Sequence, residues 1–171
     1  MKEGLTLEEM AAEITRQSRL KEDYLVDTRS LQMEPYDSQV YLHMFDGNTE
    51  PVEPMQVNTI AHRQIGTHLK IPAPYYDRML TEKPELLAAN VNTWLRHSPS
   101  KRLLRTMGGT ARAFLSNRYR RIDNMEIATA VLPIIGQMEG ARFESCQITD
   151  SRMYMKVVNT RLEAEGVPGD I

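Results

Sequence analysis

The sequence has a single cysteine, Cys146, and it has no long hydrophobic run. One cysteine excludes an intramolecular disulfide framework, which fits a reducing cytoplasm. No stretch approaches the ~18 apolar residues that a membrane-spanning helix needs. The first ten residues lack the apolar core of a signal peptide. We therefore expect a soluble cytoplasmic protein with no membrane partner.

The motifs of common catalytic and cofactor sites are also missing. The four histidines, His43, His62, His68 and His97, form no i,i+4 pair, so zinc ligation has no supporting spacing. Neither Gly-x-x-x-x-Gly-Lys-Ser/Thr nor Gly-x-Gly-x-x-Gly occurs, and no nucleotide-binding loop is indicated. We expect no enzymatic activity, no metal ion, no cofactor and no small-molecule substrate.

Charge is unevenly distributed, although the net charge is only −2. Residues 1–60 hold twelve Asp and Glu against five Lys and Arg, a net of −7. Residues 98–122 hold seven Lys and Arg and no acid, a net of +7. This asymmetry indicates a polarised surface and excludes a uniformly basic nucleic-acid binder. The alternative is that the two segments neutralise each other, within the fold or between subunits.

Hydrophobic periodicity and end signals predict the order of helices and strands. A capping box at Thr6-Leu7-Glu8-Glu9 begins a helix over about 7–21. Two strands follow over 23–34 and 39–45, then a turn at Asp46-Gly47-Asn48 and an irregular strand over 50–57. Helices are expected over 59–69, where Asn58 is the cap, then after Pro74, after Pro84, and over 125–138 behind an Asp123-Asn124 cap. The last strands cover 142–149 and 153–159, around a turn at Asp150-Ser151.

This order predicts an α+β fold with a mainly antiparallel sheet. A β-hairpin is followed by a helix and further strands, and the helices pack on one face. We expect residues 1–21 to be an N-terminal helical arm and residues 22–171 to be a single α+β domain. The domain is expected to continue beyond the C-terminus in a longer parent protein.

The most basic stretch of the chain, residues 101–121, is divided by a Gly-Gly pair at 108–109 into two short alternating runs. Paired glycines allow the positive φ angles of a two-residue hairpin turn. Such a turn predicts Arg105 directly opposite Arg112, with Phe114 on the same face. Opposed like charges destabilise a ladder by roughly 0.2–1 kcal/mol. The predicted pair therefore needs an anionic partner.

Two anionic partners fit this stretch: a phosphate backbone, or acids of the N-terminal segment such as Glu8, Glu9 and Asp37. Guanidinium groups beside aromatic rings suit single-stranded DNA, because cations hold phosphates while rings stack on bases. The predicted nucleic-acid-binding residues are Lys101, Arg102, Arg105, Arg112, Phe114, Arg118, Tyr119, Arg120 and Arg121. If the arginines pair with acids instead, both aromatic residues are expected in the core. The protein would then be an assembly or regulatory interaction protein that binds no nucleic acid.

Several linked segments resemble one known family. They are Ile71-Pro-Ala-Pro-Tyr-Tyr-Asp-Arg-Met, Ala88-Ala-Asn-Val-Asn-Thr-Trp-Leu, Leu104-Arg-Thr-Met, Arg112-Ala-Phe-Leu-Ser-Asn-Arg-Tyr-Arg-Arg-Ile-Asp-Asn and Phe143-Glu-Ser-Cys. Over roughly residues 20 to 171 the chain resembles the phage and plasmid-like proteins of domain-of-unknown-function family 932. That family has no established activity, and its members are typically longer.

A more distant analogy follows from the order of hairpin, helix and further strands in a mobile-element protein. This order is similar to that of single-strand annealing proteins of the Red-beta and Erf type, which bind DNA in a basic groove and form rings or filaments. The analogy is one of fold alone. Together the two resemblances imply a non-enzymatic DNA-binding protein of a phage or plasmid-like element. Single-stranded DNA binding or annealing in recombination, by a homo-oligomer, is the expected role.

Overall fold

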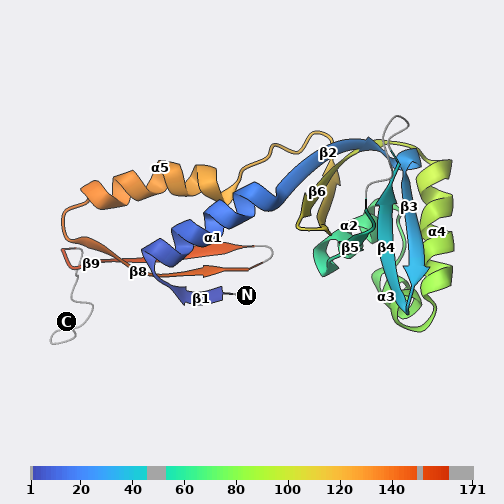
Figure 1. Ribbon diagram of the computed structural model, residues 1–171, viewed down its shortest axis with the longest axis horizontal. Coiled ribbons are helices and arrows are strands. Elements are labelled where there is room, and N and C mark those ends of the chain that lie inside the picture. Colours follow the sequence, from blue (N-terminus) through green and yellow to red (C-terminus); the bar gives the residue numbers. More distant parts are fainter. Residues whose placement is uncertain (1, 46–52, 150–151, 162–171) are drawn as a thin grey trace. The chain divides into compact units, whose positions relative to one another are not determined.

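Contacts in the computed structural model, which describes residues 2–45, 53–149 and 152–161, divide the chain into two units (Figure 1). Unit 1 comprises Met1–Arg19 and Arg121–Ile171, and unit 2 comprises Leu20–Arg120. The described residues form five helices and nine strands in two mostly antiparallel sheets, so the α+β prediction is confirmed. The expected turns at 46–48 and 150–151, and the end of the chain, lie outside the described residues.

Unit 2 is built on a six-stranded sheet with the strand order β2-β6-β7-β5-β4-β3. Neighbouring strands are antiparallel except β5 and β7, which are parallel. A short 3-10 helix, η1 (Thr28–Ser30), interrupts the strand that was predicted over 23–34. The strands are β2 (Lys21–Asp27), β3 (Leu31–Tyr36), β4 (Gln39–Met44), β5 (Met55–Val57), β6 (Lys101–Met107) and β7 (Thr110–Ser116).

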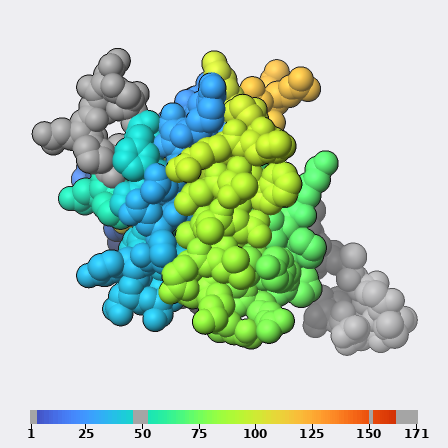
Figure 2. All heavy atoms as spheres, turned by 90° about the vertical axis from the view of Figure 1, so that its right-hand side faces the viewer, coloured from blue at the N-terminus to red at the C-terminus, as the bar shows by residue number. Residues whose placement is uncertain are grey.

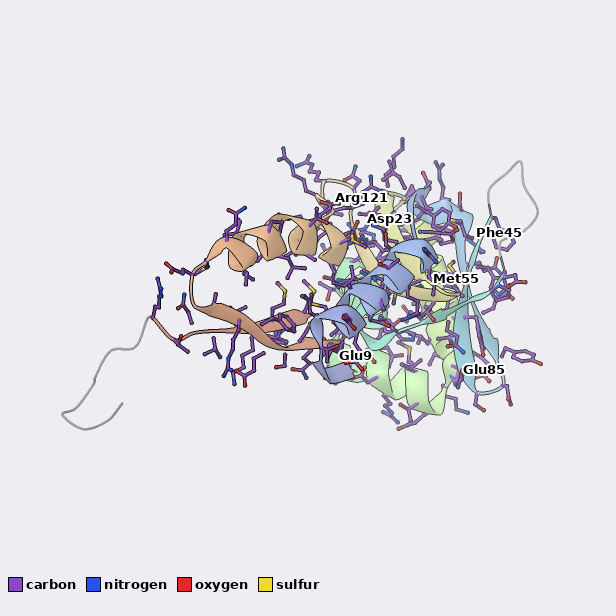
Figure 3. All side chains as sticks on the ribbon, turned by 60° about the vertical axis from the view of Figure 1, so that its left-hand side comes forward. Glu9, Asp23, Phe45, Met55, Glu85 and Arg121 are labelled. Atoms are coloured by element: carbon purple, nitrogen blue, oxygen red, sulfur yellow. The ribbon has the colours of Figure 1, made fainter. Side chains whose placement is uncertain are left out.

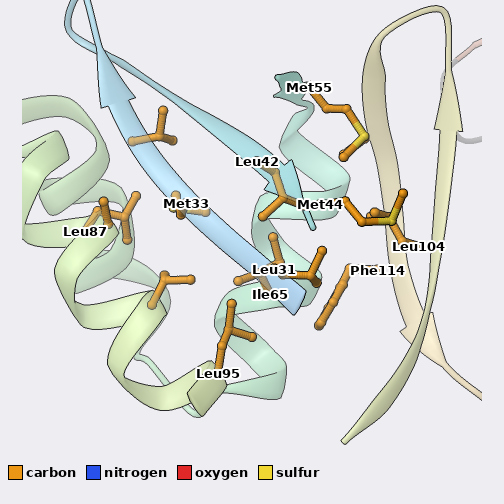
Figure 4. Packing of buried hydrophobic residues seen from close by; sticks show 14 of the residues in the cluster. Leu31, Met33, Leu42, Met44, Met55, Ile65, Leu87, Leu95, Leu104 and Phe114 are labelled. Atoms are coloured by element: carbon orange, nitrogen blue, oxygen red, sulfur yellow. The ribbon is translucent and has the colours of Figure 1, made fainter. Parts of the chain in front are cut away.

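Three helices of unit 2 separate β5 from β6: α2 (Thr59–His68), α3 (Ala73–Glu82) and α4 (Pro84–His97). The predicted cap is present, because the Asn58 side chain accepts a hydrogen bond from the Ala61 N–H at 2.8 Å. All three helices contribute to one apolar cluster with β3, β4 and β7 (Figure 4). In unit 2 the helices therefore pack on one face of the sheet, as predicted.

The turn between β6 and β7 is the two-residue turn that the sequence predicts. Gly108 and Gly109 have φ angles of +55° and +75°, which glycine adopts without strain. The first two pairs beyond the turn also have the predicted register, but Arg105 then pairs with Ala113. The register shift leaves Arg112 as the extra residue of a β-bulge. The predicted opposition of Arg105 and Arg112 is therefore wrong.

The bulge changes the direction of the side chains that follow it. Phe114 pairs with Leu104 and shares its face, on which Leu104 is fully buried. The Phe114 ring is 1% exposed and lies within the apolar cluster of unit 2 (Figure 4). Burying a ring of this size stabilises a fold by about 1.5–3 kcal/mol. The core contact of Phe114 thus accounts for the irregular register, and its predicted surface position is wrong.

Unit 1 contains a three-stranded sheet with the order β1-β8-β9, and two helices. The capping box is confirmed: the Thr6 N–H donates to Glu9 Oε2 at 2.9 Å, and the Glu9 N–H donates to Thr6 Oγ1 at 3.2 Å. Strand β1 was not predicted. The elements are β1 (Lys2–Leu5), α1 (Leu7–Leu20), α5 (Asn124–Gln137), β8 (Ala141–Ile148) and β9 (Met153–Asn159).

Helix α1 belongs to a core rather than to a separate arm. Met10 and Ile14 of α1 form one buried cluster with Ala128 of α5 and with Cys146 and Ile148 of β8. The two units therefore differ from the expected division into an arm over 1–21 and one domain over 22–171. None of the helices in the described ranges is long and apolar enough to cross a membrane.

The position of the Phe114 ring gives a first prediction. Phe114→Ala should lower the free energy of unfolding by about 3–5 kcal/mol, because it leaves a cavity in the core. The control is Tyr36→Ala, since Tyr36 is 73% exposed and its truncation should change stability by no more than about 0.5 kcal/mol. Urea denaturation measures both. Equal small effects would show that the ring lies outside the core.

Candidate nucleic-acid interface

The nine predicted nucleic-acid-binding residues occupy three different environments. Phe114 and Arg105 are buried, at 1% and 5% exposure. Arg102 and Arg112 are half-buried. Arg121 belongs to unit 1, whereas the other eight lie in unit 2. The exposed members of the set are Lys101, Arg118, Tyr119, Arg120 and Arg121.

Arg105 forms an ion pair with Asp23 on the neighbouring strand β2. Asp23 is labelled in Figure 3. Arg105 Nε lies 2.7 Å from Asp23 Oδ1, and Nη2 lies 3.3 Å from Oδ2. The two side chains are 6% and 10% exposed. An acid of the N-terminal segment therefore pairs with this arginine, although it is not one of the acids named from the sequence. Its burial removes Arg105 from any surface that a polymer can reach.

Arg102 lies over the buried ring of Phe114 and covers it on the outer side of the core. The Arg102 guanidinium carbon is 5.1 Å from the ring centroid, within the range of a cation–π contact. The His68 ring centroid lies 5.6 Å from the same ring. Burial lowers the pKa of Arg102, and burial together with Arg102 lowers the pKa of His68. Phe114 therefore stacks on a cation of its own chain, and its predicted role as a platform for a base is wrong.

Four exposed residues gather at the open end of the β6–β7 hairpin, and we call them the basic end: Lys101, Arg118, Tyr119 and Arg120. Lys101 begins β6, one residue before the Arg102–Ser116 pair. A β-turn then follows β7, because the Tyr119 N–H donates to Ser116 O at 3.0 Å and the Arg118 N–H donates to Ser116 Oγ at 3.2 Å. The residues that follow β7 therefore begin at the same end of the hairpin as Lys101, since Ser116 pairs with Arg102. The ring of Tyr119 is 49% exposed.

Asp27 is the acid that pairs with Lys101 across β2 and β6. Its carboxylate is already held by Arg29, whose Nε and Nη2 lie 2.9 Å from the two carboxylate oxygens. The hydrogen bonds from Arg29, with a smaller contribution from Lys101, lower the pKa of Asp27 to about 2. The negative charge of Asp27 is therefore largely balanced by Arg29, and the basic end keeps an excess of positive charge.

Helices α3 and α4 form much of the face of unit 2 that Figure 2 shows. A groove with a volume of about 480 Å³ lies among the helices of unit 2. Its lining comes from the end of α2, residues 69–72, the start of α3, and the middle and end of α4. Two large aromatic side chains line it, Tyr75 at 45% exposure and Trp94 at 44%. Neither ring was predicted from the sequence as part of a site. The signal that distinguishes Trp94 is that it lies one position away from the buried series Leu87, Val91 and Leu95.

The buried ion pair generates a second prediction. Asp23→Asn should destabilise the protein by about 3–5 kcal/mol, because it removes one partner of a buried charge pair. Asp77→Asn is the matched control: the Arg63–Asp77 pair has a 2.7 Å contact but is about half exposed, and its loss should cost no more than about 1 kcal/mol. Urea denaturation compares the two variants, and equal costs would contradict the burial of Asp23.

Neither a metal-binding cluster nor a comparison with known proteins indicates the function. Within the described ranges, no group of three or more His, Cys, Asp or Glu side chains is placed to hold a metal ion. No family model, no curated protein and no solved structure matches the chain. The likeness to domain-of-unknown-function family 932 and the analogy to annealing proteins stay predictions. The function proposed below therefore rests on the geometry of unit 2.

Proposed function

We propose that the protein binds single-stranded DNA, without catalysing a reaction, through the basic end of the β6–β7 hairpin. The observation that supports this most directly is the exposure of Lys101, Arg118 and Arg120 beside Tyr119 at one end of one hairpin. Their positive charge is suited to a row of phosphates, and the Tyr119 ring is suited to an unpaired base. A single strand fits this combination because only unpaired bases offer their faces for stacking.

The wider biological role is a proposal that rests on the resemblances alone. Annealing of single strands during recombination in a phage or plasmid-like element follows from the likeness to family 932 and to the Red-beta and Erf proteins. Assembly into a homo-oligomer follows from the same analogy. Binding by the basic end does not depend on either of these, because its residues all belong to unit 2.

Salt dependence gives the third prediction. The three cations of the basic end, each contacting a phosphate of a single strand, should contribute about −2 to the slope of log affinity against log salt concentration. Arg118→Ala combined with Arg120→Ala should reduce the size of that slope by about 1.4, because about 0.7 is lost for each phosphate contact. Fluorescence anisotropy of a labelled oligothymidylate, titrated with the full chain at several salt concentrations, measures both slopes.

A control variant removes the same number of positive charges at positions outside the basic end. Lys83→Ala combined with Arg142→Ala removes two exposed cations outside the basic end, one from each unit. This variant should keep the slope of the unaltered protein. No oligonucleotide binding even at low salt would overturn the proposal, and equal slopes for the two double variants would place the interface elsewhere.

A further inference from the structure

The groove beside α3 and α4 has the composition of a site for a planar, aromatic ligand. Its volume of about 480 Å³ falls within the range of small-molecule pockets. Tyr75 and Trp94 enter it from different helices, so their rings are positioned by separate elements. The Trp94 ring is held edge-on by His97, with 5.6 Å between ring centroids and 84° between ring planes. Exposed rings held in this way are stacking surfaces.

A polar atom in the lining of the groove needs a hydrogen-bond donor. Asn90 lines the groove from α4, and its Oδ1 is buried without a hydrogen-bond partner in the part of the chain that the structure describes. Leaving a buried acceptor unsatisfied is unfavourable, and rotation of the Asn90 amide toward the groove would let a ligand donate to it. Adenine, cytosine and guanine all carry an exocyclic amino group that can donate such a bond. An aromatic heterocycle with an N–H group can stack on the two rings and donate a hydrogen bond to the Asn90 amide.

A lysine occupies a strained backbone position at the rim of the same groove. Lys70 lines the groove and has a φ angle of +57°, in the left-handed region where glycine is usual. It ends α2 in a Schellman motif, in which the Ile71 N–H donates to Gly66 O at 2.9 Å and the Lys70 N–H donates to Thr67 O at 3.2 Å. Lysine at this position is conformationally unfavourable, and such strain is concentrated at functional sites. Because Lys70 lines the groove, its side chain adds a positive charge to this site.

The groove adjoins the surface that carries the basic end. His68 lines the groove, and its Nε2 lies 3.3 Å from the Oγ of Ser100, the residue before Lys101. His68 also contacts the Phe114 ring that Arg102 covers. All of these residues belong to unit 2. A strand whose phosphates lie on the basic end can therefore continue past His68 into the groove.

We propose that this groove is a base-binding subsite for single-stranded nucleic acid. One base stacks on Trp94 and Tyr75, its amino group donates to Asn90 Oδ1 when the base has one, and the adjoining phosphate is bound by Lys70. The subsite rests on the proposed function, because it takes its ligand from a strand that also lies on the basic end. The two surfaces act differently: the basic end binds backbone charge, whereas the groove binds the face of a base.

Trp94 is the single tryptophan of the chain, so its fluorescence reports on the groove alone. The full chain is titrated with an oligonucleotide that contains all four bases, and Trp94 emission is followed alongside the anisotropy of the labelled strand. The expected result is that emission falls along the same curve on which anisotropy rises, because stacking changes the environment of the indole. An abasic strand with the same phosphates is expected to raise anisotropy at higher protein concentration and to leave the emission unchanged.

Substitutions test whether the rings contribute to affinity. Trp94→Leu and Tyr75→Leu should each weaken binding by about 5- to 150-fold, the range that corresponds to loss of one stacked base. Tyr75→Leu keeps the Trp94 reporter. Tyr36→Leu removes an aromatic ring that is 73% exposed at another site of unit 2, and it should leave the affinity unchanged.

The outcomes separate this inference from the proposed function. A rise in anisotropy without a change in Trp94 emission would overturn the subsite and leave binding by the basic end intact. The subsite would also be overturned if the abasic strand lowered Trp94 emission as much as the normal strand does. The same conclusion would follow if the Trp94→Leu and Tyr75→Leu variants bound with the affinity of Tyr36→Leu. Absence of any anisotropy change at low salt would overturn the proposed function, and the subsite with it.

A pair of variants at Lys70 gives the fifth prediction, with opposite effects on stability and binding. Lys70→Gly should raise the Tm by about 2–4 °C, because glycine relieves the left-handed strain, while the salt slope falls by about 0.7. Lys70→Ala should reduce the size of the salt slope by the same amount, but without the rise in Tm. If Lys70→Gly keeps the full slope, Lys70 does not bind a phosphate.

Discussion

The burial of the Phe114 ring determines which charges of the hairpin reach solvent. The bulge at Arg112 sets Phe114 opposite Leu104 and places the ring in the apolar cluster of unit 2. On the same strand pair, Arg102 covers the ring and Arg105 is directed to the other face, where Asp23 binds it. Among the cations of residues 101–120, those left exposed are at the open end of the hairpin. The core contact of Phe114 thus determines which basic residues of the hairpin are buried and which are exposed.

In the function that we propose, the two surfaces of unit 2 bind two parts of the same polymer. The basic end presents charge, whose contribution to binding decreases as salt increases. The groove presents Trp94 and Tyr75, whose contribution comes from stacking and is less sensitive to salt. His68 connects them, because it lines the groove and contacts both Ser100 and the Phe114 ring. A strand held by its phosphates alone would slide freely, whereas a stacked base fixes its position.

Local signals in the sequence predicted most of the secondary structure. The capping box at Thr6, the cap at Asn58, the prolines at the helix starts and the glycine pair at 108–109 act within a few residues, so their effects can be read from the chain. The bulge could not be predicted in this way, because it depends on the fit of Phe114 to residues far away in the sequence. A one-residue shift then reversed the faces assigned to the second strand.

The candidate site was predicted only in part, for a similar reason. Residue type identified the cations that are exposed, but not Asp23 as the partner of Arg105, since strand pairing between β2 and β6 brings them together. The groove of Trp94 and Tyr75 was not predicted, because the packing of three helices brings its lining together. The most direct test of the account is the effect of single-stranded DNA on the amide NMR spectrum of the full, ¹⁵N-labelled chain. The account predicts shifts at the Trp94 indole and at the backbone of residues 117–120, with Lys83 and Tyr36 unchanged; shifts confined to other residues, or none at all, would contradict it.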